Sequence, residues 1–190
     1  MSEKNKQMIK QMIKQINIAS DLNFLTEGVE DNERFVEAYG EEASINGAGR
    51  IDVFGHVWSD DLQPFMRDGG LTISFGVIAG DFDCSNRNLD VLTGCPWRVS
   101  GTFSCTDNDL TSLEGAPEKV NGNFYCRNNK INTLVDAPEF VGGTFDCSHN
   151  ELRSLDGDIK VIKEDLICMY NPLESTEHNI DIGGDLISDN

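Results

Sequence analysis

The stretch that decides the fold runs from residue 101 to residue 131 and reads GTFSCTDNDLTSLEGAPEKVNGNFYCRNNKI. Its first five residues, GTFSC, return 21 residues later as GNFYC. The same interval separates five cysteines, which are Cys84, Cys105, Cys126, Cys147 and Cys168. Self-similarity at a fixed period of this length is typical of solenoids, in which each structural unit stacks on the one before it.

The positions around each cysteine repeat together with it. A bulky apolar residue precedes the cysteine by two, and Leu or Ile follows it by five and, in four copies, by eight. A Gly or Asp, a Pro and a β-branched residue then complete most copies. The apolar columns are Phe82, Phe103, Phe124, Phe145 and Leu166; Leu89, Leu110, Ile131, Leu152 and Leu173; Leu92, Leu113, Leu134 and Leu155; and Val99, Val120, Val141 and Ile162. A final partial copy in residues 182–188 arrives one residue early and puts Ser188 in the cysteine column.

Each unit is predicted to be one coil with one short parallel strand. Phe and Cys are two residues apart, so both point to one face of a strand and line a core, while the residue between them points out. An Asn follows the cysteine by three in four coils: Asn108, Asn129, Asn150 and Asn171. A buried amide there can bond the main chain of neighbouring coils. Arg87 breaks this column in the first clear coil.

The string from Leu110 to Ile131 resembles the bacterial type of leucine-rich repeat, in which a Pro-containing stretch replaces the helix of longer repeats. It is more similar still to leucine-rich-repeat-like proteins of large tailed bacteriophages, whose coils read LTSLEGAP and CxxN. Residues 50–59, RIDVFGHVWS, resemble the strand that opens the array in those proteins. The resemblance covers roughly residues 45–190. It implies a fold and a phage origin but no mechanism, because such families share a scaffold rather than a function.

The expected fold class is α+β and mostly β: a leucine-rich-repeat-like solenoid with one short parallel strand per coil, capped at its N-terminus by one or two helices. Residues 1–45 are predicted to form the helical cap and residues 46–190 the solenoid, with clear coils from about 78 to 190. Within the cap, residues 4–18 have an amphipathic helical pattern. A second helix is predicted from Asp31, as N-cap, to Gly40, as stop. Residues 59–73 fit the repeat poorly and are expected to form an irregular loop.

The cysteine column permits two interpretations. Adjacent parallel strands lie about 4.7 to 4.9 Å apart, so distance alone allows disulfides between coils. Reduced thiols are favoured, because the column accepts Ser188 and a small buried thiol serves well as a core residue. Cys95, outside the column, is expected to be the most reactive. No Cys-x-x-Cys or His-x-x-x-His pair occurs, so we expect neither a metal site nor a cofactor.

The net charge of the chain limits the classes of partner that it can attract. Among 190 residues, 15 Lys and Arg oppose 33 Asp and Glu, which gives a formal charge of -18. This is the wrong sign for attraction to phosphate backbones or anionic lipid, so direct binding to nucleic acid or a membrane is not expected. The lysine-rich pattern of residues 4–18 suits a membrane surface less than the end of the solenoid, because it lacks Trp and Phe. The sequence predicts a cytoplasmic protein, in the host cytoplasm if a phage encodes it.

No catalytic residues are predicted. The three histidines, His56, His149 and His178, lie in different segments without a visible nucleophile partner. The glycine-rich segments are interpreted as turns between coils and not as phosphate loops, because Gly-x-x-x-x-Gly-Lys does not occur and the entry into each strand explains the repeated Gly. We therefore expect a binding protein rather than an enzyme.

The expected function is a non-catalytic protein–protein interaction module that binds a host or phage protein through the concave sheet face. Tyr125 and Arg127 sit near the middle of the outward columns, and buried aromatic and Arg anchors carry much of the energy of interfaces. The predicted partner-binding residues are Asp83, Ser104, Tyr125, Arg127, Asp146, Ile167 and Met169.

Two other functions remain open. One is an acidic nucleic-acid mimic that blocks a DNA- or RNA-binding host protein. It would use acids on the convex side and loops, namely Glu114, Glu118, Glu139, Asp156 and Asp158. The other is a virion or assembly component. Either role is compatible with a homodimer formed through the N-terminal helix or the last coil.

Overall fold

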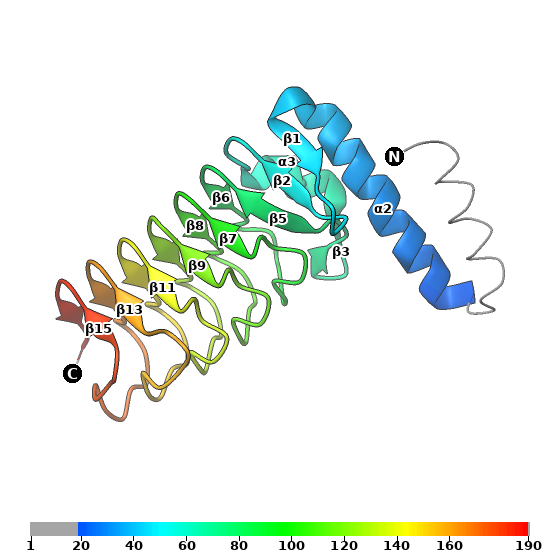
Figure 1. Cartoon of the computed structure of the whole chain (residues 1–190). Coiled ribbons are helices and arrows are strands. Elements are labelled where there is room, and N and C mark those ends of the chain that lie inside the picture. Colours follow the sequence, from blue (N-terminus) through cyan, green and yellow to red (C-terminus); the bar gives the residue numbers. More distant parts are fainter. Residues whose placement is uncertain (1–18, 190) are drawn as a thin grey trace.

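The computed structural model describes the backbone of residues 19–189 and the side chains of residues 28–189. A helix, α2 (Ala19–Tyr39), and a 3-10 turn, η1 (Gly40–Glu42), lead into β1 (Ala43–Ile45) and β2 (Ile51–Val53). The short helix α3 (Ser59–Leu62), the 3-10 turn η2 (Gln63–Phe65) and the strands β3 (Met66–Arg67) and β4 (Gly70–Leu71) follow. From there on, the chain winds in stacked coils (Figure 1).

Each coil contributes a strand to each of two sheets. The eight-stranded sheet has the order β1-β2-β5-β7-β9-β11-β13-β15, and the six-stranded sheet has the order β16-β14-β12-β10-β8-β6. The strands of the first are β5 (Phe75–Ile78), β7 (Arg98–Val99), β9 (Lys119–Val120), β11 (Phe140–Val141), β13 (Val161–Ile162) and β15 (Asp181–Ile182). Those of the second are β6 (Phe82–Asp83), β8 (Phe103–Ser104), β10 (Phe124–Tyr125), β12 (Phe145–Asp146), β14 (Leu166–Ile167) and β16 (Leu186–Ile187).

The predicted mostly-β solenoid of parallel strands is confirmed, and all strand pairs in the two sheets are parallel except β1 with β2. The expectation of one strand per coil is wrong, because the coils have two. In β7, β9, β11 and β13 the second strand holds one buried residue, such as Val99 in β7. The recognised strand carries Phe and Cys two residues apart, whereas the second strand has a single apolar column, so no alternation marked it in the sequence.

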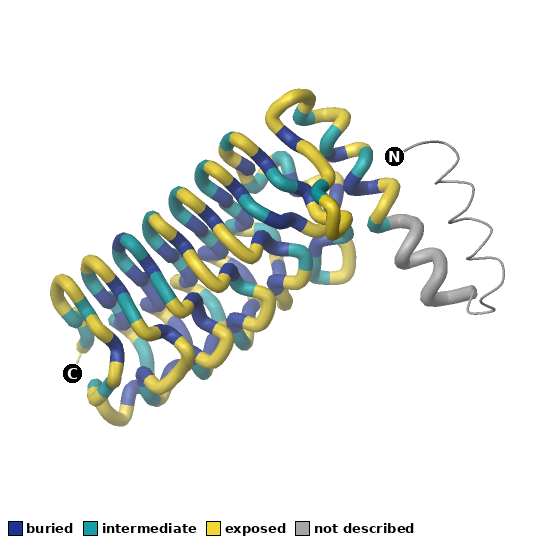
Figure 2. The backbone as a smooth tube through the Cα atoms, in the orientation of Figure 1, coloured by how far each residue is buried: buried dark blue, intermediate teal, exposed yellow. Residues whose placement is uncertain are grey.

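Stacking in register builds the core. Phe124 pairs with Phe103 on one side and with Phe145 on the other. The ring centroids of these neighbours are 5.2 and 5.0 Å apart. Figure 2 shows the buried residues recurring at matching places from coil to coil. A single coil cannot bury its own apolar face, so each depends on the next.

All six cysteines are buried and free, which confirms the prediction of reduced thiols. Cys95 is 6% exposed, so the thiol expected to be most reactive is also enclosed. The coils also approach closely at their glycines. A Cβ added to Gly122 would lie 2.7 Å from the carbonyl carbon and oxygen of Gly101, a distance that a real Cβ does not tolerate.

The predicted asparagine ladder is present. The Nδ2 group of Asn129 donates to the carbonyls of Cys105 and Cys126, at 3.0 and 3.1 Å, and its Oδ1 accepts from the amide of Leu110 at 3.0 Å. Asn108, Asn150 and Asn171 repeat the arrangement. Each amide therefore ties the main chains of neighbouring coils together.

Helix α2 closes the N-terminal end of the array (Figure 1). Phe35 packs edge-on against Phe65 and Phe75, with centroids 5.5 and 5.1 Å away. The predicted helix end is confirmed, because α2 stops at Tyr39, directly before Gly40 with its φ of 67°. The predicted start at Asp31 is wrong. That residue lies inside α2, and its buried carboxylate accepts from the Thr72 hydroxyl instead of capping a helix. The amphipathic segment 4–18 lies outside the described residues.

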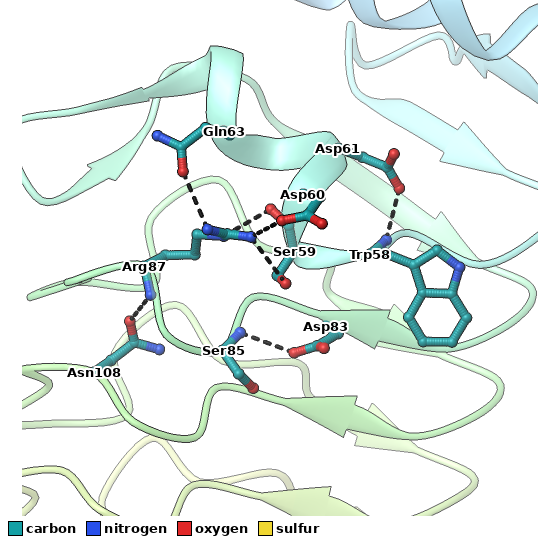
Figure 3. A network of polar contacts seen from close by, with 9 residues as sticks. All are labelled: Trp58, Ser59, Asp60, Asp61, Gln63, Asp83, Ser85, Arg87 and Asn108. Atoms are coloured by element: carbon teal, nitrogen blue, oxygen red, sulfur yellow. Dashed lines mark hydrogen bonds and ion pairs between the residues drawn. The ribbon is translucent and has the colours of Figure 1, made fainter.

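Residues 59–73 are ordered secondary structure rather than the irregular loop that was expected. Asp61, the third residue of α3, accepts through Oδ2 from the amide of the N-cap residue Trp58 at 2.9 Å, as in a capping box. Arg87 secures the segment from the first coil (Figure 3). Its guanidinium donates to the Ser59 carbonyl at 2.8 Å and to Gln63 Oε1 at 3.1 Å, and it forms an ion pair with Asp60. This long-range contact explains why local pattern alone missed the structure.

Candidate functional site

The outward side chains of the six-stranded sheet form the surface on which binding was predicted. We call it the six-strand face. Its middle column runs in register through Asp83, Ser104, Tyr125, Asp146, Ile167 and Ile187. The column before it contains Asp81, Thr102, Asn123, Thr144, Asp165 and Asp185, and the column after it contains Ser85, Thr106, Arg127, Ser148, Met169 and Asp189.

A depression of about 440 Å³ lies near the middle of the six-strand face. It is lined by Ser85, Ser104, Thr106, Asp107, Tyr125 and Arg127. Three predicted binding residues, Ser104, Tyr125 and Arg127, thus come together. Ser85, Thr106 and Asp107 were missed, although the first two belong to the same outward columns. The 21-residue period places Ser85 and Thr106 in the same column as Arg127, and this alignment could have indicated them.

Hydrogen bonds fix the walls of the depression. Ser85 Oγ and Ser104 Oγ lie 2.7 Å apart, and Ser104 Oγ lies 3.3 Å from Thr106 Oγ1. On the other side, Asn123 Nδ2 donates to the Tyr125 hydroxyl at 2.7 Å, which holds the half-buried ring in place. The site is therefore preorganised, and a partner would lose little side-chain entropy on these walls.

Arg127 is the single Lys or Arg in the three columns of the six-strand face. Its side chain is exposed and forms no ion pair with any of residues 28–189. The carboxylate of Asp107 in the same depression accepts from Asn128 Nδ2 at 2.7 Å and forms no ion pair with Arg127. The guanidinium thus keeps its donors available for a group that comes from outside.

The other predicted residues lie beside the depression rather than in it. Asp83 and Asp146 each accept a hydrogen bond from a backbone amide two residues ahead, at 2.9 and 3.0 Å. Asp146 is 9% exposed, so it serves the turn more than the surface. Ile167 and Met169 are half-buried and belong to a coil two further along the array. They extend the face without contributing to the depression.

The cysteine thiols beneath the six-strand face are in an environment that makes them unreactive. Burial raises the pKa of Cys84, Cys105, Cys126 and Cys147 well above the usual value, and it raises the pKa of Cys168 to about 11. Neutral thiols are poor nucleophiles and poor metal ligands. Within the described part of the chain, no group of three or more His, Cys, Asp or Glu is arranged to hold a metal ion.

An exposed aromatic pair at the edge of the face was also missed. Tyr170 is 61% exposed and stacks on His149 with centroids 4.3 Å apart. Both have left-handed backbones, with φ of 56° and 55°. The same column begins with Asn86, Asp107 and Asn128, which adopt this conformation readily. In the sequence, the change in this column from Asn and Asp to His149 and Tyr170 could have indicated the exposed aromatic pair.

Comparison of the chain with protein-family models, with curated proteins and with solved structures found no match in any of the three. Among the helices of the described residues, none combines the length and the apolar character needed to cross a membrane. The six-strand face is therefore the feature that points to a function.

Proposed function

We propose that this protein is a non-catalytic interaction module that binds a partner protein through the six-strand face, with Tyr125 and Arg127 as its anchors. The observation that carries the proposal is the unpaired Arg127 guanidinium on a hydroxyl-lined depression. Tyr and Arg are enriched among residues that dominate binding energy. A rigid sheet that presents both is suited to this use.

The charges around the depression define what the partner must supply. Arg127 calls for a carboxylate, which it can bind through two parallel hydrogen bonds. Elsewhere on the six-strand face, the exposed or half-buried carboxylates are Asp81, Asp83, Asp165, Asp185 and Asp189. The complementary surface is therefore an acidic residue surrounded by basic or hydrogen-bond-donating residues. Such an arrangement also fixes the orientation of the partner.

The proposed setting follows from the sequence resemblance. A leucine-rich-repeat-like protein of a tailed bacteriophage would act in the host cytoplasm, and its partner would be a host or phage protein. The net charge of -18 supports a protein partner over a nucleic acid. A homodimer is a further assembly that fits the proposal.

The test is an affinity capture from bacterial lysate with the wild type and a Tyr125→Ala, Arg127→Glu double variant. The matched control is Phe54→Ala, Arg153→Glu, which also removes an exposed aromatic ring and reverses an exposed arginine. We expect a partner that the wild type and the control retain and the site variant loses. Equal retention by all three proteins would contradict the proposed site.

The same capture separates the alternatives. An acidic nucleic-acid mimic would use Glu114, Glu118, Glu139, Asp156 and Asp158, all of which are exposed. Its binding would fall steeply between about 50 and 200 mM salt and would ignore the change at Tyr125. A virion component would be found in purified particles. Binding that depends on Tyr125 and Arg127, with little salt dependence, supports the module.

A further inference from the structure

The second strand of each coil creates another exposed surface, which we call the eight-strand face. Its outward residues pair in register from β5 to β15 in the order Val77, Arg98, Lys119, Phe140, Val161 and Asp181. Trp97 stands directly before this column and is 38% exposed. The face thus combines cations with aromatic and apolar side chains at its centre.

The two cations of this column, Arg98 and Lys119, are neighbours, and no carboxylate in the described part of the chain is paired with them. Arg98 and Lys119 lie opposite on β7 and β9, and like charges in that position repel. Neither forms an ion pair with residues 28–189. Glu118 and Glu139 occupy the neighbouring column, where Glu139 is already paired with Lys160. In a chain with a charge of -18, two adjacent cations without carboxylate partners are unusual.

Aromatic rings hold both cations against the surface. The Arg98 guanidinium carbon lies 4.7 Å from the centroid of the Trp97 ring, and Lys119 Nζ lies 4.8 Å from that of Phe140. A cation over a ring remains able to bind an anion on its other side. The half-buried Phe140 and Val161 add apolar area next to it.

We propose that the eight-strand face is a second docking surface, and that its occupant is an acidic protein segment that also carries an aromatic or large apolar side chain. Two carboxylates of the segment pair with Arg98 and Lys119 and remove their mutual repulsion. The apolar side chain covers Trp97 and Phe140. Charge complementarity selects an acidic segment, and the overall negative charge of the chain disfavours a long polyanion such as nucleic acid. The protein could then bridge two partners through its two faces.

The two tryptophans of the chain allow a direct test. In a Trp58→Phe variant, Trp97 is the only tryptophan, and its emission reports on this face. The probe is a synthetic peptide of repeated Asp-Glu-Phe units, with an Asn-Gln-Phe peptide as its neutral counterpart. We expect a saturable change of Trp97 emission with the acidic peptide and a response at least about tenfold weaker with the neutral one.

Charge reversal identifies the residues. On the Trp58→Phe background, Arg98→Glu with Lys119→Glu should weaken peptide binding at least about tenfold. The control, Lys130→Glu with Arg153→Glu, changes the net charge equally and should stay within about twofold. Equal weakening in both variants, or no saturable change in the parent, would overturn the proposal. Tighter binding of oligothymidylate than of the acidic peptide would overturn it in favour of a nucleic-acid surface.

Binding on the eight-strand face can be tested independently of binding on the six-strand face. Tyr125→Ala with Arg127→Glu should leave this peptide titration unchanged, because those residues lie on the other sheet. A lost titration in that variant would contradict two independent faces.

Discussion

Asn150 shows why the position three residues after each column cysteine is occupied by Asn. Its Nδ2 donates to the carbonyls of Cys126 and Cys147, both at 3.0 Å, and its Oδ1 accepts from the amide of Ile131 at 3.0 Å. Asp would lack the donors and Ser would be too short to reach three main-chain groups. Across residues 28–189, no fully buried side-chain nitrogen or oxygen lacks a hydrogen-bond partner. The ladder is one reason for this.

Asn150→Ala should lower the free energy of unfolding by about 3 kcal/mol, because it leaves buried main-chain groups without partners at about 1 to 3 kcal/mol each. Urea denaturation measures the change. Asn132→Ala is the control, since Asn132 is exposed, and it should stay within about 0.5 kcal/mol of the wild type. A loss below 1 kcal/mol for Asn150→Ala would show that the ladder is not a main source of stability.

The buried thiols predict a loss of stability at high pH. An unfolded thiol titrates near its ordinary pKa, whereas burial raises the pKa of the folded thiols, that of Cys168 to about 11. Folding stability is therefore complete below the ordinary value, about pH 8.5, and falls as the pH rises above it, because only the unfolded chain releases its protons. Urea midpoints at pH 7, 9 and 10.5 should show this decline.

Cys126→Ala isolates the contribution of one thiol to that pH dependence. The variant is destabilised at every pH because a core sulfur is lost, but its stability should fall less steeply above pH 9 than that of the wild type. The difference is at most about 1.4 kcal/mol per pH unit. Parallel curves would contradict the role assigned to the thiol. In the folded protein, Ellman's reagent should leave Cys126 unmodified at pH 8.

At the scale of elements, the periodic parts of the molecule were predictable and the parts made by long-range contact were not. The coils, the cysteine stack and the asparagine ladder follow from the 21-residue period. Helix α3 does not, because Arg87, far along the chain, holds it in place. For the candidate site, the outward columns were predictable. The burial of each side chain in these columns was not predictable, because it depends on how neighbouring coils pack. Asp146, which is 9% exposed, is an example.

Arg87 replaces the ladder at the first coil for a geometric reason. The amide of Asn129 reaches the carbonyl of a residue 24 positions earlier, and for position 87 that residue would be Gln63, which lies in η2 rather than in a regular coil. The longer Arg side chain bridges the gap and binds both Ser59 and Gln63. It thus joins the irregular segment to the array.

Arg87→Asn restores the column residue but removes the bridge. We expect hydrogen exchange of the amides in residues 59–71 to accelerate at least about tenfold, because opening of this segment no longer breaks the charge-assisted bonds of the Arg87 guanidinium. Coils beyond Asn108 should keep their protection. Arg153→Ala, which removes an exposed ion pair with Glu174, is the control and should leave the segment unchanged. Uniform acceleration along the chain would instead indicate global destabilisation.

The whole molecule behaves as a one-dimensional stack. Phe82, Phe103, Phe124, Phe145, Leu166 and Leu186 pair in one unbroken series along the six-stranded sheet. Each coil therefore offers the next one the same surface, and stability is approximately a sum over coils and their interfaces. Internal coils should consequently be interchangeable if the register is kept.

Deletion of residues 142–162 tests this directly, because it removes one period of 21 residues and joins Val141 to Lys163, the equivalent of Gly142. The shortened protein should fold with the same β-type circular dichroism, a smaller urea m-value and an array shorter by about 4.8 Å in solution scattering. Deletion of residues 142–161, one residue fewer, leaves an extra residue between β11 and the next strand, a step that has the same length in every coil from β7 onward. It should therefore disturb the register of the coils that follow, whereas the last coil, which is naturally one residue shorter, loses its residue between β14 and β15. If both deletions gave equally stable proteins, the coils would not be held by register. The first deletion leaves Tyr125, Arg127, Arg98 and Lys119 in place, so it should also retain binding on both faces.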